Sequence, residues 1–160
     1  MIEPLHLSLE LDCDVAHAFA VFTDMASSWW PRTHSVSQAQ GLTVVFEPRP
    51  GGRIFERAPD GTEYDWGEVV LWEPPTRLGY LWHLRADRTD ATDVHITFTP
   101  LSDHSTRIDI VHGGWDRLDE RGPSRREANQ KGWGGLLPHY LAACTRRSTA
   151  TPLVAPETSR

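Results

Sequence analysis

The sequence predicts an α+β domain in which an antiparallel sheet packs against one long C-terminal helix. Two observations predict this fold class. Short segments with alternating apolar and polar residues recur between residues 5 and 112, and turn signals separate them, as in a sheet of consecutive hairpins. Near the C-terminus, apolar residues recur instead at steps of three and four, the period of an α-helix that buries one face. A chain of 160 residues is long enough for one such domain with a real core.

The first strand and a short helix are predicted at the N-terminus. Leucines alternate with polar residues over residues 2–12, so this segment should be a half-buried strand. Asp12 or Asp14 can cap a helix over residues 15–22, whose apolar side chains fall on one face. A second short helix is expected over residues 26–30, because Pro31 disfavours helical geometry in the residue before it.

Six further strands are predicted, most of them joined by tight turns. Polar residues over 31–41 and 85–91 indicate two longer loops. The turns are marked by Pro50-Gly51-Gly52, Asp60-Gly61, Pro74-Pro75 and Asp103-His104. The predicted strands cover residues 42–47, 53–57, 63–72, 77–84, 94–99 and 107–112.

A helix over residues 123–144 should cover one face of this sheet. Pro138 falls inside the apolar pattern, and the glycines before it leave room for its ring, so we expect a bend between Gly134 and Pro138. Residues 146–160 show no period, so we expect a folded domain over residues 1–145 and a disordered tail after it. The apolar stripe of the helix comprises Trp133, Leu136, Leu137, Tyr140, Leu141 and Cys144.

Composition narrows the classes of function. The formal net charge is −6, and no basic run is present, which argues against binding to nucleic acid or to an anionic membrane surface. The sequence shows neither a transmembrane stretch nor a signal peptide, so we expect a cytoplasmic protein. Cys13 and Cys144 form no C-x-x-C pair, and two buried thiols are favoured over a disulfide. Seven tryptophans in a small chain indicate a broad aromatic-lined surface.

Several short motifs occur in an order typical of one protein family. They are residues 15–22 with Thr23-Asp24, Trp29-Trp30-Pro31, Pro50-Gly51-Gly52, Gly67-Glu68-Val69, Trp72-Glu73-Pro74-Pro75, Arg77-Leu78, Tyr80-Leu81-Trp82, the run from Thr106 to Trp115, and Gly132-Trp133. Together they span residues 5–145, and the chain resembles the START-related, birch-pollen-allergen-like superfamily (SRPBCC). Within it, the chain is similar to small bacterial members of the family named for the activator of the heat-shock-protein ATPase. The resemblance implies a helix-grip fold, in which a curved seven-stranded antiparallel sheet wraps around the C-terminal helix.

The resemblance also implies a cavity between the sheet and that helix. Ligand pockets are mostly apolar with a few polar groups, and the strand alternation indicates which side chains face inward. In the alternative interpretation, these side chains fill a solid core and leave no cavity. The predicted ligand-binding residues are Trp30, Tyr64, Trp66, Tyr80, Trp82, Phe98, Ile110, His112, Trp133, Leu137 and Tyr140.

Two polar residues are predicted on the same inward face. Glu68 shares the parity of Trp66 and Val70, and His112 shares that of Ile110. A buried Glu or His is costly unless paired, so the two are expected to pair with each other or with a tyrosine. They are the candidates for acid–base chemistry, although no catalytic role is assigned to either. Alternatively, His112 ends its strand and hydrogen-bonds a loop.

We therefore predict a protein that binds a small apolar or aromatic molecule, as a monomer or a homodimer. The histidine spacings match no metal motif, and no phosphate loop or nucleophile motif occurs, so no metal or cofactor is expected. Two other functions stay open. A buried Glu68–His112 pair reaching the cavity would favour a cyclase-, aromatase- or hydrolase-like enzyme. An exposed apolar patch outside the cavity would favour a chaperone-linked interaction module.

Overall fold

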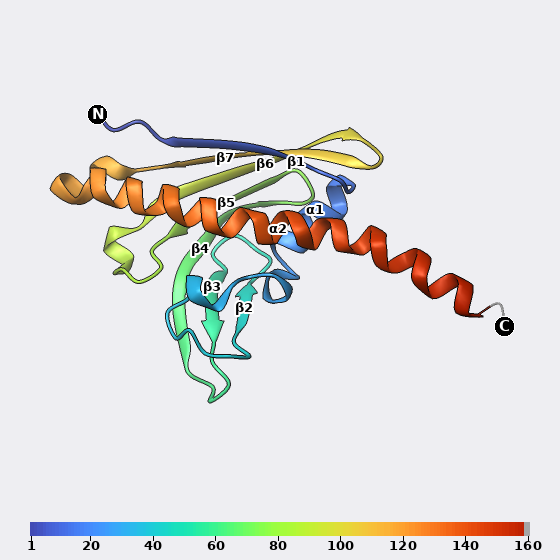
Figure 1. Cartoon of the computed structure of the whole chain (residues 1–160). Helices are drawn as coiled ribbons and strands as arrows, with labels where there is room; N and C mark the ends of the chain where they lie inside the picture. The colour runs from blue at the N-terminus through green and yellow to red at the C-terminus, as the bar shows by residue number, and fades with distance from the viewer. Residues whose placement is uncertain (159–160) are drawn as a thin grey trace.

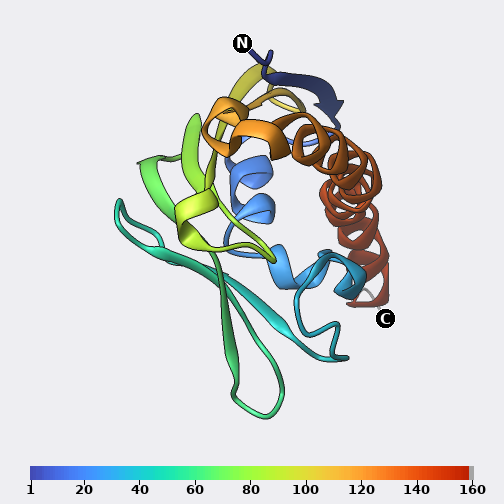
Figure 2. The ribbon, with the colours of Figure 1, turned by 90° about the vertical axis from the view of Figure 1, so that its left-hand side faces the viewer.

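The computed structural model describes the backbone of residues 1–158 and the side chains of residues 1–145. It contains one seven-stranded antiparallel sheet in the order β1-β7-β6-β5-β4-β3-β2, which curls around α1 and is faced by α2 (Figures 1 and 2). This confirms the predicted helix-grip fold. The strands are β1 Leu5–Leu11, β2 Thr43–Phe46, β3 Arg53–Arg57, β4 Glu63–Glu73, β5 Arg77–Trp82, β6 Thr92–Ser102 and β7 Ser105–Gly113. The helices are α1 Val15–Phe22 and α2 Gly122–Thr158, with 3₁₀ turns η1 Ala26–Ser28, η2 Arg32–His34, η3 Arg88–Asp90 and η4 Trp115–Arg121.

Helix α1 lies between the sheet and α2 (Figure 2). Of the two candidate caps, Asp14 is the one used: its carboxylate accepts a hydrogen bond of 2.7 Å from the His17 amide. On the buried face of α1, the Phe22 ring packs edge-on against Tyr140 of α2, with centroids 5.2 Å apart. The Tyr140 hydroxyl donates to the Ala18 carbonyl at 2.7 Å. One end of the space between sheet and helix is therefore filled with core.

Helix α2 buries a narrower stripe than the sequence predicts. Leu141 is 39% exposed and Leu137 only half-buried, so neither belongs to the buried stripe. The helix passes through Pro138 without a break and extends beyond residue 145 to Thr158. The side chains of residues 146–158, and all of residues 159–160, lie outside the described part, so the domain boundary and the disordered tail stay predictions. The buried residues on α2 are Trp133, Leu136, Tyr140, Ala143 and Cys144.

Strand β4 departs twice from strict alternation. Its register against β3 shifts at Trp66, and Trp66 and Gly67 are both buried. Its register against β5 shifts again between Val69 and Leu71, and Val70 is 50% exposed. An extra residue in a strand moves the residues after it to the opposite face. The predicted inward parity of Val70 and Glu68 is therefore wrong, and Val69 is the buried residue.

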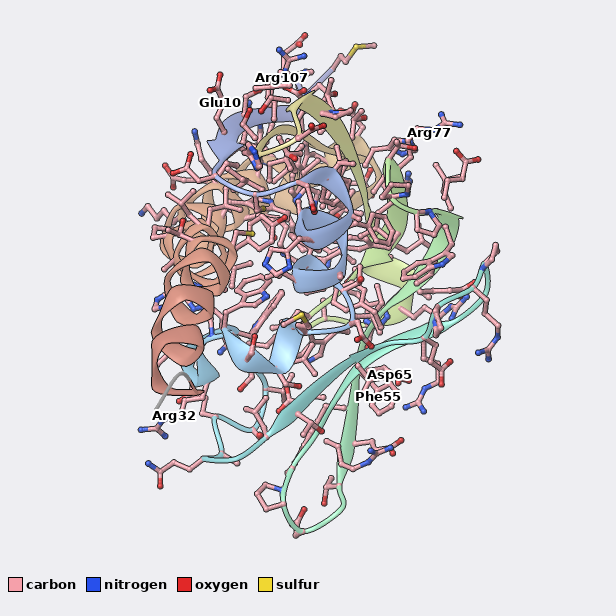
Figure 3. The ribbon with its side chains drawn as sticks, turned by 90° about the vertical axis from the view of Figure 1, so that its right-hand side faces the viewer. Glu10, Arg32, Phe55, Asp65, Arg77 and Arg107 are labelled. Carbon is pink, nitrogen blue, oxygen red and sulfur yellow. The ribbon has the colours of Figure 1, made fainter. Side chains whose placement is uncertain are left out.

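The outer face of β3 and β4 carries charged side chains that pair across the strands. Figure 3 labels Phe55 and Asp65, which lie opposite each other on this face. The Arg53 guanidinium is 2.8 Å from the Asp65 carboxylate, and its Cζ lies 4.0 Å from the centroid of the Phe55 ring. Because the guanidinium groups of Arg53 and Arg57 lie over the ring, Phe55 is only 3% exposed on an outward face.

Cys13 and Cys144 are both buried, and no disulfide joins them. Hydrogen bonding between the two thiols and burial both raise the pKa of Cys144 well above its ordinary value. The Cys144 thiol therefore stays protonated at neutral pH.

Candidate ligand-binding cavity

A cavity of about 320 Å³ lies between β5, the first buried turns of α2 and the segment around η2. Its apolar lining is mostly buried: Trp30 is 8% exposed, Trp133 7% and Tyr80 1%. Its polar lining is half-buried or exposed, so the cavity is apolar inside and polar toward solvent. The apolar lining residues are Trp30, Tyr80, Trp82, Leu84, Trp133 and Leu136. The polar ones are Thr33, His34, Arg85, Arg125 and Asn129.

Aromatic side chains pack against one another behind and around this lining, with tilted or edge-on rings. Trp30 lies 5.0 Å from Trp66 and 6.1 Å from Trp82, measured between ring centroids, and Trp82 lies 5.6 Å from Tyr80. Two of the indole N–H groups bond within the protein. Trp30 donates to the His34 carbonyl at 2.9 Å, and Trp66 donates to a Glu56 carboxylate oxygen at 2.8 Å. The Trp30 ring therefore presents aromatic carbon, rather than a free donor, to the cavity that it lines.

Glu56 fixes the segment that closes the cavity on the η2 side. This carboxylate is fully buried, and it accepts hydrogen bonds from the amides of Val36 at 2.6 Å and Ser37 at 3.0 Å. Burial acts to raise its pKa, but the hydrogen bonds from Ser37, Val36 and Trp66 together outweigh burial and lower it. Glu56 thus stays ionised and ties the loop after η2 to the sheet.

His112 faces the concave side of the sheet, as its parity predicts, but it does not line the cavity. Its Nδ1 accepts a hydrogen bond of 3.0 Å from the Trp133 indole, which can only donate. The proton of the neutral ring is therefore on Nε2, which lies 2.8 Å from the Thr92 hydroxyl. Burial lowers the pKa of His112 to about 3. The ring is neutral, with both nitrogens occupied, and its role here is to orient Trp133.

Glu68 does not pair with His112. The first bulge of β4 turns Glu68 to the outer face, where its carboxylate forms an ion pair with Arg88 of η3. The expected Glu68–His112 pair is therefore wrong, and with it the observation that would have favoured an acid–base enzyme.

The remaining predicted residues divide into three groups. Trp30, Tyr80, Trp82 and Trp133 line the cavity. Trp66, Phe98, Ile110 and Tyr140 are buried in the packed interior, and Leu137 is half-buried beside it. Tyr64 lines a different depression, together with Asp65 and Asp87. On α2, the cavity is lined by Leu136 rather than by Leu137.

Two arginines and one histidine at the cavity were missed by the sequence analysis. Arg85 has a left-handed backbone, with φ of 62°, and its Nη2 donates to the carbonyls of Thr33 at 3.2 Å and Ser35 at 2.6 Å. The pKa of His34 lies below its ordinary value, chiefly because the ring is partly buried and less because of the electrostatic effects of His139 and Arg85. His34 and Arg85 lie in segments predicted as polar loops, and Arg125 lies in the polar first turns of the predicted helix. No periodicity in these segments indicates a role for the three residues.

A second depression lies on the other side of α1, toward the β4–β5 turn. It has a volume of about 430 Å³, and its lining is mostly apolar. Trp72 contributes to it, with its ring packed edge-on against Phe19 at 5.1 Å.

Residues 12–145 match the family described as Activator of Hsp90 ATPase homolog 1-like protein. The chain belongs to this family. This Hsp90-activator-like chain is 30% identical to an anthrahydroquino-gamma-pyrone synthase, over 77% of this chain and 84% of that one, with a TM-score of 0.57. The comparison with curated proteins gave no match.

Two further solved structures share the fold of this Hsp90-activator-like chain. The self-sacrificing resistance protein CalC from Micromonospora echinospora is 22% identical, over 91% of this chain and 96% of that one, with a TM-score of 0.71. An HSP90 activator from Plasmodium falciparum is 18% identical, over 70% and 73%, with a TM-score of 0.52. At these identities the likeness shows the fold alone.

The described residues of this chain contain neither a membrane-spanning helix nor a cluster of metal ligands. None of the helices described here combines the length and the apolar character needed to cross a membrane. Within the same residues, no three His, Cys, Asp or Glu side chains gather as metal ligands.

Proposed function

We propose that this protein binds a planar aromatic molecule in the cavity between β5 and α2. One observation carries the proposal: Trp30, Tyr80, Trp82 and Trp133 line a cavity of about 320 Å³ that is partly open to solvent. That volume lies within the range of small-molecule sites, and aromatic faces favour stacking with flat rings. Because the indole N–H groups of Trp30 and Trp133 bond within the protein, these two rings offer an apolar ligand no unmet donor.

The comparisons support the same ligand class. The synthase that is 30% identical to this chain is named for a fused aromatic product, an anthrahydroquino-gamma-pyrone. Shared ancestry at this level supports a related kind of ligand here, while leaving its identity and any reaction open.

Gly132 offers a test that fills the cavity without disturbing its walls. A Cβ added at Gly132 meets nothing within 4 Å, although this residue lines the cavity. Gly132→Leu should therefore occupy the space meant for the ligand, and it should also favour the helix by about 1 kcal/mol. We expect N-phenyl-1-naphthylamine, a neutral aromatic dye, to bind the unchanged protein with fluorescence enhancement. The Gly132→Leu variant should bind it at least about 10-fold more weakly.

Gly134→Leu is the matched control. Gly134 also lies on α2 with open space around its Cβ position, but it does not line the cavity. This variant should bind the dye like the unchanged protein. If the dye does not bind saturably, or if both leucine variants weaken it equally, the proposal is wrong.

A second candidate function, contact with a chaperone, is favoured by the apolar depression beside Trp72. It is an apolar surface outside the cavity, and the chain's family is named for Hsp90 ATPase activation. In this case the protein should raise ATP hydrolysis by an Hsp90-type chaperone, and Trp72→Glu should remove the effect. An unchanged rate of ATP hydrolysis would reject this second function and would have no bearing on ligand binding in the cavity.

A further inference from the structure

The polar part of the cavity carries positive charge in a chain whose net charge is −6. The charge comes from Arg85 and Arg125, and His34 lines the cavity beside them. Among residues 1–145, no Asp or Glu side chain does. The effect of this clustering is visible at His34, because the neighbouring Arg85 and His139 contribute to lowering its pKa, after burial. Charges of one sign around a concave apolar site focus a field that attracts the opposite sign.

Arg85 is held in place without being neutralised. In the described part of the chain, both hydrogen bonds of its side chain leave from Nη2 and end on backbone carbonyls, which carry no net charge. A guanidinium has five N–H donors, so Nε and Nη1 keep three donors available for another acceptor. Within the described residues, Arg85 forms no ion pair, whereas eight other arginines do. The two carbonyl contacts thus fix the position of a cation that keeps its capacity for an anion.

Arg125 is the second such cation. Together with Arg85 it also lines the separate depression that contains Asp65, Asp87 and Asp90, and of these acids Asp65 pairs with Arg53 and Asp90 with Arg121. Arg125 lies close enough to Asp90 to help lower the pKa of that carboxyl, although Arg121 has the larger effect. However, the Asp90 carboxylate is bound at both oxygens by Arg121, at 2.8 and 3.1 Å. Arg125 therefore forms no ion pair in the part of the chain that the structure describes. It lines the same cavity as Arg85, and a fork of donors on each arginine suits a two-oxygen anion.

We propose that the ligand is a planar aromatic anion, whose rings lie among the tryptophans and whose acidic group is bound by Arg85 and Arg125. The acidic group is a carboxylate or a sulfonate, which share the paired oxygens that a guanidinium recognises. This inference rests on the proposed function and names the class of ligand for the same cavity.

Two dyes that differ only in charge test the inference. 8-Anilinonaphthalene-1-sulfonate carries a sulfonate on the ring system of the neutral N-phenyl-1-naphthylamine. We expect the sulfonate to bind the unchanged protein about 10-fold more tightly than the neutral dye, and this advantage to shrink as NaCl is raised. Arg85→Gln and Arg125→Gln should each weaken binding of the sulfonate about 5- to 10-fold, and each should change the affinity for the neutral dye by less than about 2-fold.

Arg77→Gln is the control, since Arg77 is an exposed arginine at the far end of β5 that pairs with Glu73 (Figure 3). This substitution should leave the affinity for both dyes unchanged. If both dyes bind equally well and the arginine variants leave them unchanged, the anion inference is wrong and the proposed function stands. If neither dye binds saturably, both are wrong.

Discussion

At the scale of single residues, His112 shows how burial turns an ionisable side chain into a structural one. Its imidazole is fully buried between the Trp133 indole and the Thr92 hydroxyl, and each ring nitrogen has one partner. Because Trp133 lines the cavity, His112 acts on the cavity only through the orientation of that ring. Its position on the concave face could be predicted from parity. Its hydrogen bonds could not, because the partners come from β6 and α2.

The depressed pKa of His112 predicts a loss of stability in mild acid. In the unfolded chain its pKa is about 6.5, whereas in the folded protein it is about 3. Below pH 6.5 the unfolded state therefore binds one more proton, and the free energy of unfolding should fall by about 2 kcal/mol between pH 7.5 and pH 5 from this group alone. Urea unfolding at the two pH values should show this loss, and His112→Gln should lack it.

His104→Gln, in the exposed β6–β7 turn, controls for the loss of one imidazole. It should keep the pH dependence of the unchanged protein. Equal pH dependence in His112→Gln and the unchanged protein would mean that the folded ring titrates normally.

At the scale of elements, β4 decides which side chains reach the cavity side of the sheet. Alternation predicts the strand itself from sequence, as it does for β1, β6 and β7. It fails within β4 because each bulge adds one residue, and the alternation of apolar and polar residues around Trp66 and Val70 does not show the extra residues. The only physical hint is Gly67, whose lack of a side chain allows a close approach of β5.

Gly67→Ala should therefore destabilise the protein strongly. A Cβ at this position would lie 2.0 Å from the Leu81 carbonyl oxygen, a backbone atom that cannot move away cheaply. We expect a loss of about 3 kcal/mol in the free energy of unfolding, measured by thermal or urea unfolding. Gly132→Ala, which meets open space on α2, should instead be neutral or stabilise by up to about 1 kcal/mol. Unchanged stability in Gly67→Ala would show that the bulge does not need glycine.

At the scale of the whole molecule, the fold could be predicted because two different periods run along the chain. The sheet, α1 and α2 follow from local patterns. Strand parity and the helical stripe indicate Tyr80, Trp82 and Trp133 of the aromatic cavity lining, but parity alone does not separate them from Phe98 and Ile110, which lie in the packed interior. The charged part of the cavity could not be predicted, because Arg85 and Arg125 come from a loop and a polar helix start that look like ordinary solvated surface. Only the tertiary structure brings them together with Trp82 and Trp133.

The indole N–H signals of the seven tryptophans report whether an aromatic ligand enters the cavity between β5 and α2. In a ¹H–¹⁵N NMR titration with N-phenyl-1-naphthylamine, we expect saturable shifts for Trp30, Trp82 and Trp133, which line the cavity. The signal of Trp72, which lies at the separate depression beside α1, should stay unchanged. Shifts at Trp72 with none at the three cavity tryptophans, or no shift at any of them, would contradict the account.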